Sequence, residues 1–140
     1  MGETQPVILV DLNVVLDVVQ KRSPHYHASS AVLDEVVHGK SSAAVAAHAV
    51  TTIHYIVGRY NDAETADKVV DWVLRYFSVA PVGRAEFVRA RALSWSDFED
   101  AVVAAAAESM GCSAIVTRNV KDFAKSPVNA LTPEHYLLRT

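Results

Sequence analysis

The feature that most constrains the fold is a short apolar run that ends on a carboxylate. Residues 6–11 read PVILVD, a β-branched segment between Pro6 and Asp11. Such a run, without alternation of polar and apolar residues, is typical of a strand buried on both faces of a helix-covered parallel sheet. A carboxylate beside that core is costly unless it is paired, hydrogen-bonded or bound to a cation. Asp11 therefore needs a partner from elsewhere in the chain.

Helix-like and strand-like segments alternate along the rest of the sequence. The expected helices cover residues 12–20, 25–38, 53–60, 63–77, 84–93 and 96–110. The expected strands cover residues 6–11, 43–50, 78–82 and 113–117, followed by a short strand or turn within 129–138. This alternation is typical of the α/β class. We expect a single three-layer domain over residues 1–140, with a mostly parallel central sheet flanked by helices.

The composition narrows the classes of protein that the chain can represent. Hydrophobic residues make up 51% and charged residues 21% of the 140 residues, which suits one globular domain. The net charge of -3 provides no general basic surface for nucleic acid, although it allows a local basic rim. Cys112 is the only cysteine, so no internal disulfide forms, and the first apolar run is too interrupted by polar residues to span a membrane. We expect a cytoplasmic protein without membrane association.

Polar residues follow several of the expected strands. Asp11 ends the first strand, Thr51 and Thr52 end the second, and Thr117 ends a later one. In α/β sheets, ligands bind at the carboxyl ends of the strands, where successive crossovers diverge. We therefore expect these strand ends to converge on one site.

Three further acids lie close to the same strand ends in the sequence. Asp97 and Asp100 open the alanine-rich helix, where Ser96 and Glu99 have the spacing of a capping box, and Asp122 follows the strand that ends at Thr117. Singly, each acid has a structural explanation as a helix-capping or turn-forming residue. Crowded together with Asp11, they would repel one another unless a hard cation bound them. Mg²⁺ or Mn²⁺ is the natural occupant and suits hydrolysis of a phosphodiester.

The sequence resembles the PIN domains, and in particular the VapC-like toxins of bacterial toxin-antitoxin pairs. The resemblance rests on ILVDLNVVLD at residues 8–17, SDFEDAVVAAAAESMG at 96–111 and AIVTRNVKDF at 114–123. It implies a Mg²⁺- or Mn²⁺-dependent endoribonuclease that cleaves single-stranded RNA through metal-activated water. A cognate antitoxin protein and a homodimer are also implied by the resemblance.

The resemblance assigns roles to individual residues. Asp11 matches the first acid and Asp100 the acid of the alanine-rich helix, while Asn13 and Thr117 match polar residues that brace the first acid. The expected catalytic and metal-binding set is Asp11, Asp97, Asp100 and Asp122. The expected pocket-lining set is Asn13, His54, Thr117 and Asn119. Arg118 and Lys121 are expected to bind RNA phosphates, with ordinary surface charge as the alternative.

Two positions depart from the pattern of the family. His54 stands on the helix where the family usually carries a glutamate, and Asn119 replaces an aspartate in the stretch that reads TRN here. Loss of two carboxylates lowers affinity for hard cations, because ligand charge is a main determinant of their binding. The alternative is therefore a catalytically weakened PIN-fold protein that acts by binding an antitoxin, RNA or its own dimer partner.

Two other chemistries fit the sequence less well. A phosphatase of the haloacid dehalogenase type also begins with a strand that ends in aspartate, but it needs a second carboxylate at position 13, which is Asn13. A zinc site would need a Cys pair or an H-E-x-x-H pattern, and the sequence has neither.

Overall fold

A computed structural model describes residues 5–139, so the expected domain of residues 1–140 extends beyond the described part at both ends. The strands are β1 (Val7–Val10), β2 (Ser42–Ala46), β3 (Ser78–Ala80), β4 (Ala114–Val116) and β5 (Ala130–Leu131). The helices are α1 (Leu12–Val19), α2 (Tyr26–Val37), α3 (Ala47–Tyr60), α4 (Ala63–Tyr76), α5 (Arg84–Leu93), α6 (Phe98–Met110) and α7 (Pro133–Leu137), with a short 3₁₀ helix η1 (Val120–Phe123). None of the helices within 5–139 is long and apolar enough to cross a membrane.

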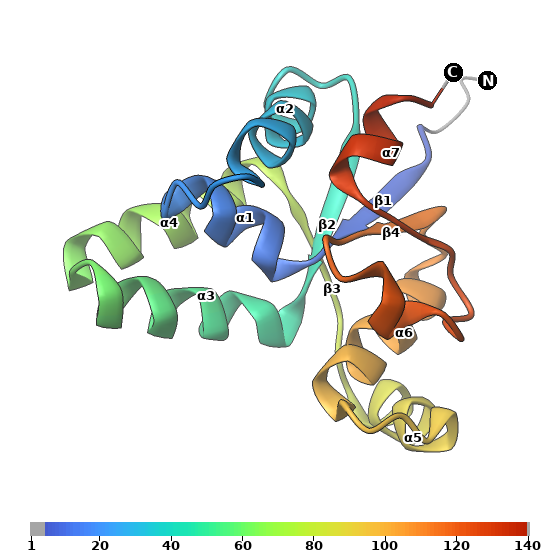
Figure 1. Cartoon of the computed structure of the whole chain (residues 1–140). Coiled ribbons are helices and arrows are strands. Elements are labelled where there is room, and N and C mark those ends of the chain that lie inside the picture. The colour runs from blue at the N-terminus through green and yellow to red at the C-terminus, as the bar shows by residue number, and fades with distance from the viewer. Residues whose placement is uncertain (1–4, 140) are drawn as a thin grey trace.

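The strands form one sheet in the order β3-β2-β1-β4-β5, and every neighbouring pair is parallel. The predicted α/β class with a parallel central sheet is confirmed. The chain moves outward from β1 to β2 and β3 and then returns to β4 on the opposite side of β1 (Figure 1). The direction of winding therefore reverses between β1 and β4, which is where α/β sheets bind ligands.

Helices cover both faces of the sheet, which gives the three layers that we expected. Along β1, Ile8 and Val10 pack into the cluster that includes residues of α1, α2, α3 and α4, whereas Leu9 packs into the cluster that includes α6. Because side chains alternate between the faces of a strand, one apolar run serves both cores. Ala104 and Ala107 of α6 are fully buried, and their small side chains let this helix lie close to the strands.

The boundary between the second strand and the helix that follows it differs from the sequence prediction. The second strand ends at Ala46, so Thr51 and Thr52 lie inside α3 rather than at a strand end. Their hydroxyls donate to the carbonyl of His48 at 3.0 Å and 3.2 Å, which satisfies both polar groups within the helix. The apolar run over residues 43–50 did not reveal this boundary, because periodicity alone does not separate short buried strands from helices.

The start of α6 and the segment over residues 129–138 also differ from the sequence prediction. Asp97, not Ser96, caps α6, and its carboxylate accepts a hydrogen bond from the backbone of Asp100 at 3.0 Å. Gly111 ends this helix in a left-handed conformation, as its position predicted. The segment over residues 129–138 contains the strand β5 and also the helix α7, which Thr132 caps.

Candidate active-site cleft

Asp11 and Thr117 lie side by side at the carboxyl ends of the two central strands. β1 and β4 are paired with Val10 opposite Val116, and the backbone nitrogen of Asp11 donates to the carbonyl of Val116 at 2.9 Å. Asp11 is only 6% exposed and Thr117 is fully buried. The predicted convergence of these two strand ends is therefore confirmed, while Thr51 and Thr52 lie outside it.

Hydrogen bonds hold the Asp11 carboxylate in one orientation. It caps α1 by accepting from the backbone of Leu12 at 2.8 Å, and its second oxygen accepts from the Thr117 hydroxyl at 2.9 Å. The side-chain amide of Asn13 donates to the same oxygen at 3.2 Å. The backbone nitrogen of Asn119 donates to the Thr117 hydroxyl at 3.1 Å, so that hydroxyl is itself fixed. This is the bracing that the resemblance implied for Asn13 and Thr117.

Asp100 brings a second carboxylate to this edge from the first turn of α6. Burial, and then the negative charges of Asp97, Asp11 and Asp122 in that order of effect, together raise the pKa of Asp100 to about 7. Burial also raises the pKa of Asp11, against the lowering effect of its hydrogen bonds to Thr117 and Leu12. Asp11, Asp97 and Asp122 therefore all act electrostatically on Asp100, although Asp11 and Asp122 come from segments that are far from it in the sequence.

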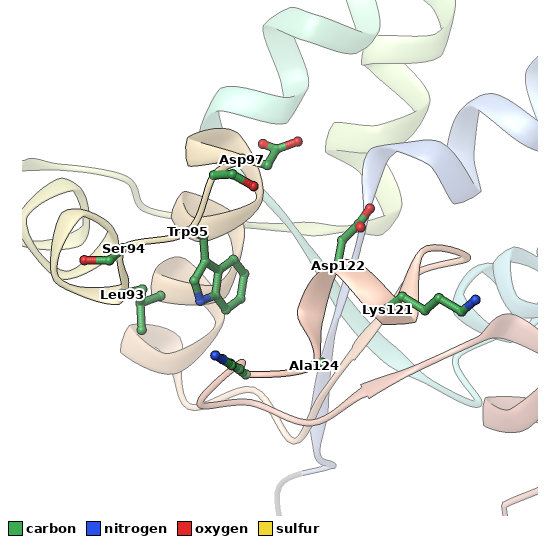
Figure 2. A pocket seen from close by; sticks show the side chains of 9 residues that line it. Leu93, Ser94, Trp95, Asp97, Lys121, Asp122 and Ala124 are labelled. Atoms are coloured by element: carbon green, nitrogen blue, oxygen red, sulfur yellow. The ribbon is translucent and has the colours of Figure 1, made fainter.

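Two hollows divide these acids between them. The first, which we call the acidic cleft, has a volume of about 300 Å³ and is lined by Asp11, Leu12, Asn13, Leu16, Arg22, Ile56, Glu99, Asp100, Val103, Arg118 and Asn119. The second, which we call the side cavity, has a volume of about 740 Å³ and is lined by Leu93, Ser94, Trp95, Ser96, Asp97, Lys121, Asp122, Ala124 and Lys125. In Figure 2 the carboxylates of Asp97 and Asp122 lie at the same end of the side cavity, and Lys121 extends away from them.

The donor set of the acidic cleft fits a hydrated divalent cation rather than a fully protein-ligated one. Within residues 5–139, no three side chains of His, Cys, Asp or Glu lie close enough together to hold a metal ion. Mg²⁺ commonly keeps several water molecules and binds through one or two carboxylates. Asp11 and Asp100 can provide those two, and the side-chain oxygen of Asn13 is buried without a hydrogen-bond partner in the described structure.

His54 does not lie in the acidic cleft, so its expected placement is wrong. Its ring nitrogen Nε2 lies 2.8 Å from the Asp67 carboxylate on α4, and both side chains are largely exposed. The face of α3 that lines the cleft carries Ile56, and Thr52 lies one turn earlier on that face. The sequence of α3 contains no acid, so this helix adds no carboxylate to the cleft.

Arg118 and Lys121, the two residues expected to bind RNA phosphates, do not lie together on one exposed rim. Lys121 is exposed and lines the side cavity, whereas Arg118 lines the acidic cleft, and its guanidinium lies 2.9 Å from the buried carboxylate of Asp17.

The sequence did not indicate that Glu99 and Arg22 line the cleft. Glu99 had been explained as a helix-capping residue, and no local pattern pointed to Arg22.

Comparison with known proteins agrees with this arrangement. A family model described as PIN domain matches residues 7–121. The chain is 23% identical over 137 residues to the Ribonuclease VapC1 of Aquifex aeolicus (strain VF5), covering 94% of each sequence. Among solved structures it resembles VapBC2 from Rickettsia felis bound to a promoter DNA fragment, with a TM-score of 0.70, 14% identity and coverage of 90% and 98% of the two chains. It also resembles VapC20 of Mycobacterium tuberculosis, a sarcin-ricin loop cleaving toxin, with a TM-score of 0.68, 13% identity and coverage of 84% and 94%. At these identities the structural likeness shows the fold alone.

Proposed function

Because this chain belongs to the PIN domain family, we propose that it is a Mg²⁺- or Mn²⁺-dependent endoribonuclease and the toxin of a toxin-antitoxin pair. The observation that carries the proposal is the meeting of Asp11 and Asp100 at the reversal point of a parallel sheet. Their segments are far apart in the sequence, and burial with neighbouring negative charge raises the pKa of Asp100 to about 7. Such crowding is costly for the fold and is relieved by a divalent cation.

Each residue of the site has a distinct role in the proposed reaction. Asp11 and Asp100 would hold the ion, and Asp97 and Asp122 add negative charge from the side cavity. Thr117 and Asn13 keep the Asp11 carboxylate in its ligating orientation, because both donate hydrogen bonds to it. When bound, Mg²⁺ or Mn²⁺ supplies a more acidic water for attack on the phosphodiester and neutralises charge on the phosphate. Asn119 lines the same cleft as a neutral polar residue.

The proposed substrate is single-stranded RNA. Arg118 lines the acidic cleft, Lys121 lines the side cavity, and both are positioned to meet phosphates of a strand that crosses from one hollow to the other. A flexible single strand can follow two adjacent hollows more readily than a duplex.

The proposed partners are a cognate antitoxin protein and a second copy of the chain in a homodimer. The proposed location is the cytoplasm, without membrane association. The curated relative named Ribonuclease VapC1 and the VapBC2 complex support this assignment to a toxin-antitoxin pair.

A second candidate function follows from the composition of α3. Because α3 contributes only Ile56 to the lining of the cleft, and position 119 is Asn, the cleft has fewer carboxylates than the family pattern implies. A protein with weak metal affinity would act by binding the antitoxin, RNA or its dimer partner.

A cleavage assay distinguishes the two functions. Single-stranded and duplex RNA are incubated with the protein in Mg²⁺, Mn²⁺ or EDTA, and Asp100→Asn is compared with Asp71→Asn, which removes an exposed carboxylate on α4. We expect metal-dependent cleavage of the single strand that Asp100→Asn abolishes and Asp71→Asn leaves intact. RNA binding without cleavage in either metal would favour the binding function.

A further inference from the structure

Asp17 is a second buried carboxylate that the proposed reaction does not use. It lies on α1 with no exposed surface, and its Oδ1 is 2.9 Å from Nη1 of Arg118 and 3.9 Å from Nη1 of Arg22. The Ser29 hydroxyl donates to its other oxygen at 3.4 Å. Burial raises the pKa of the Asp17 carboxyl, and the guanidinium of Arg118 acts against that rise. One carboxylate thus faces two guanidinium groups that come from opposite ends of the chain.

The turn after α1 places Arg22 beside Asp17. The backbone nitrogen of Arg22 donates to the carbonyl of Asp17 at 2.9 Å, and that of Lys21 donates to the carbonyl of Val18 at 3.3 Å. These two hydrogen bonds define a Schellman ending, whose left-handed position normally carries glycine. Here that position is Lys21, with φ of 51°, a conformation that strains a residue with a side chain. The chain therefore accepts local strain where it folds Arg22 back over α1.

Both arginines line the acidic cleft, and their positive charges share it with the carboxylates of Asp11, Glu99 and Asp100. Two guanidinium charges share the single carboxylate of Asp17, so one positive charge is left over on this side of the cleft. Asp17 is the only ion-pair partner that Arg22 and Arg118 have among the described residues. Nη2 of Arg22 also donates to the side-chain oxygen of Gln20. The N–H groups of the two guanidiniums that have no partner among the described residues suit a phosphate, which accepts parallel hydrogen bonds from a guanidinium.

We propose that Arg22 and Arg118 form a phosphate-binding wall of the acidic cleft and that Asp17 is the positioning residue that holds both guanidiniums toward it. The ligand is a backbone phosphate of single-stranded RNA, beside the phosphodiester that the carboxylates address. This inference rests on the proposed function for the identity of the ligand. It extends that function by adding Arg22 as a contact and by explaining the buried charge of Asp17.

The test measures binding of a fluorescent single-stranded RNA by anisotropy over a series of salt concentrations in EDTA. Every protein carries Asp100→Asn, which lowers repulsion in the cleft and prevents cleavage. Arg22→Gln should weaken binding roughly tenfold, the effect of losing a hydrogen bond to a charged group. It should also reduce the slope of log affinity against log salt by about 0.7, the value for one lost phosphate contact on a single strand. Arg22→Lys, which keeps the charge, should restore most of the slope.

Asp17→Asn gives the sharpest distinction, because simple electrostatics and positioning predict opposite signs. Removing a negative charge should tighten RNA binding if only net charge matters. We expect it instead to weaken binding severalfold, because both guanidiniums lose the carboxylate that orients them. The matched controls are Asp71→Asn and Arg75→Gln, two exposed residues of α4, whose last turn leads to the opposite edge of the sheet from the cleft. Asp71→Asn should leave binding unchanged or slightly tighter, and Arg75→Gln should leave the salt slope unchanged.

Melting curves of each variant show whether it folds. If Asp17→Asn does not fold, the comparison of Arg22→Gln with Arg75→Gln decides the question. Equal affinities and slopes for that pair would overturn the phosphate-binding wall without affecting the proposed endoribonuclease. Weakened binding by Arg22→Gln in a protein whose wild type cleaves no RNA would support the wall and contradict the proposed catalysis. A parent protein that binds no RNA would overturn the wall itself.

Discussion

Replacing Asp100 by asparagine should stabilise the metal-free protein at pH 8. Burial and the charges of Asp97, Asp11 and Asp122 raise the pKa of Asp100 from 3.8 to about 7, so the folded state binds this proton more tightly than the unfolded state. The stabilisation from the bound proton is complete below the unfolded pKa and is lost as the pH rises through about 7. Asparagine is uncharged at every pH and keeps the backbone hydrogen bond to Asp97.

The size of this stabilisation follows from the shift in the pKa of Asp100. A difference of about three pKa units corresponds to roughly 4 kcal/mol at about 1.4 kcal/mol per unit. Asp100 is partly exposed, so solvent screening reduces this figure to about 1–3 kcal/mol. For a domain of this size the midpoint of thermal unfolding should rise by about 4–12 °C at pH 8 and by much less at pH 5.

Circular dichroism melts in EDTA between pH 5 and 8.5 provide the measurement. The informative quantity is the difference in midpoint between Asp100→Asn and the wild type. The pH dependence that other titrating groups cause is common to both proteins and cancels in this difference. His48 is one such group, since burial lowers its pKa and gives the opposite pH dependence. Asp71→Asn serves as the control and should show no difference that depends on pH. A midpoint for Asp100→Asn that lies below that of the wild type at pH 8 would refute the crowding argument. With saturating Mg²⁺ the order should reverse, because only the wild type retains both ligating carboxylates.

Three further outcomes are expected. Asp11→Asn should lower the free energy of unfolding by about 1–3 kcal/mol in chemical denaturation, because the new amide group faces the hydroxyl donor of Thr117; a neutral effect would mean that its hydrogen bonds are replaceable. Thr52→Glu should tighten Mn²⁺ binding in calorimetric titration, since it adds a carboxylate to the cleft face of α3, whereas His54→Glu should not. Lys121→Glu should weaken RNA binding and reduce the slope of log affinity against log salt by at least about 0.7. An unchanged slope would mean that Lys121 is an ordinary surface residue that contacts no RNA phosphate.

Local sequence patterns were sufficient for the framework of the protein. The apolar run before Asp11 identified a strand covered on both faces, and the alternation of segments indicated a parallel α/β sheet. The positions of Asp11 and Thr117 at strand ends followed from the same patterns, and so did the end of α6 at Gly111. These features depend on near neighbours in the chain, because strand burial, helix capping and turn conformation are decided within a few residues.

The tertiary structure decided which side chains meet. The rotation of α3 about its axis turned His54 toward Asp67 of α4 and Ile56 toward the cleft. One residue of error in a helix boundary moves a side chain by about 100° around the axis. The pairing of Asp17 with Arg118 joins residues that are 101 positions apart, so no local pattern contains it. The division of the four acids between two hollows likewise depends on how α6 and η1 pack against the sheet. The sequence by itself determined which segments form strands and helices and at which of their ends charged residues stand, because those preferences are local. Which charges share a cleft was decided only by packing, because electrostatic contact depends on distance in space and not on separation along the chain.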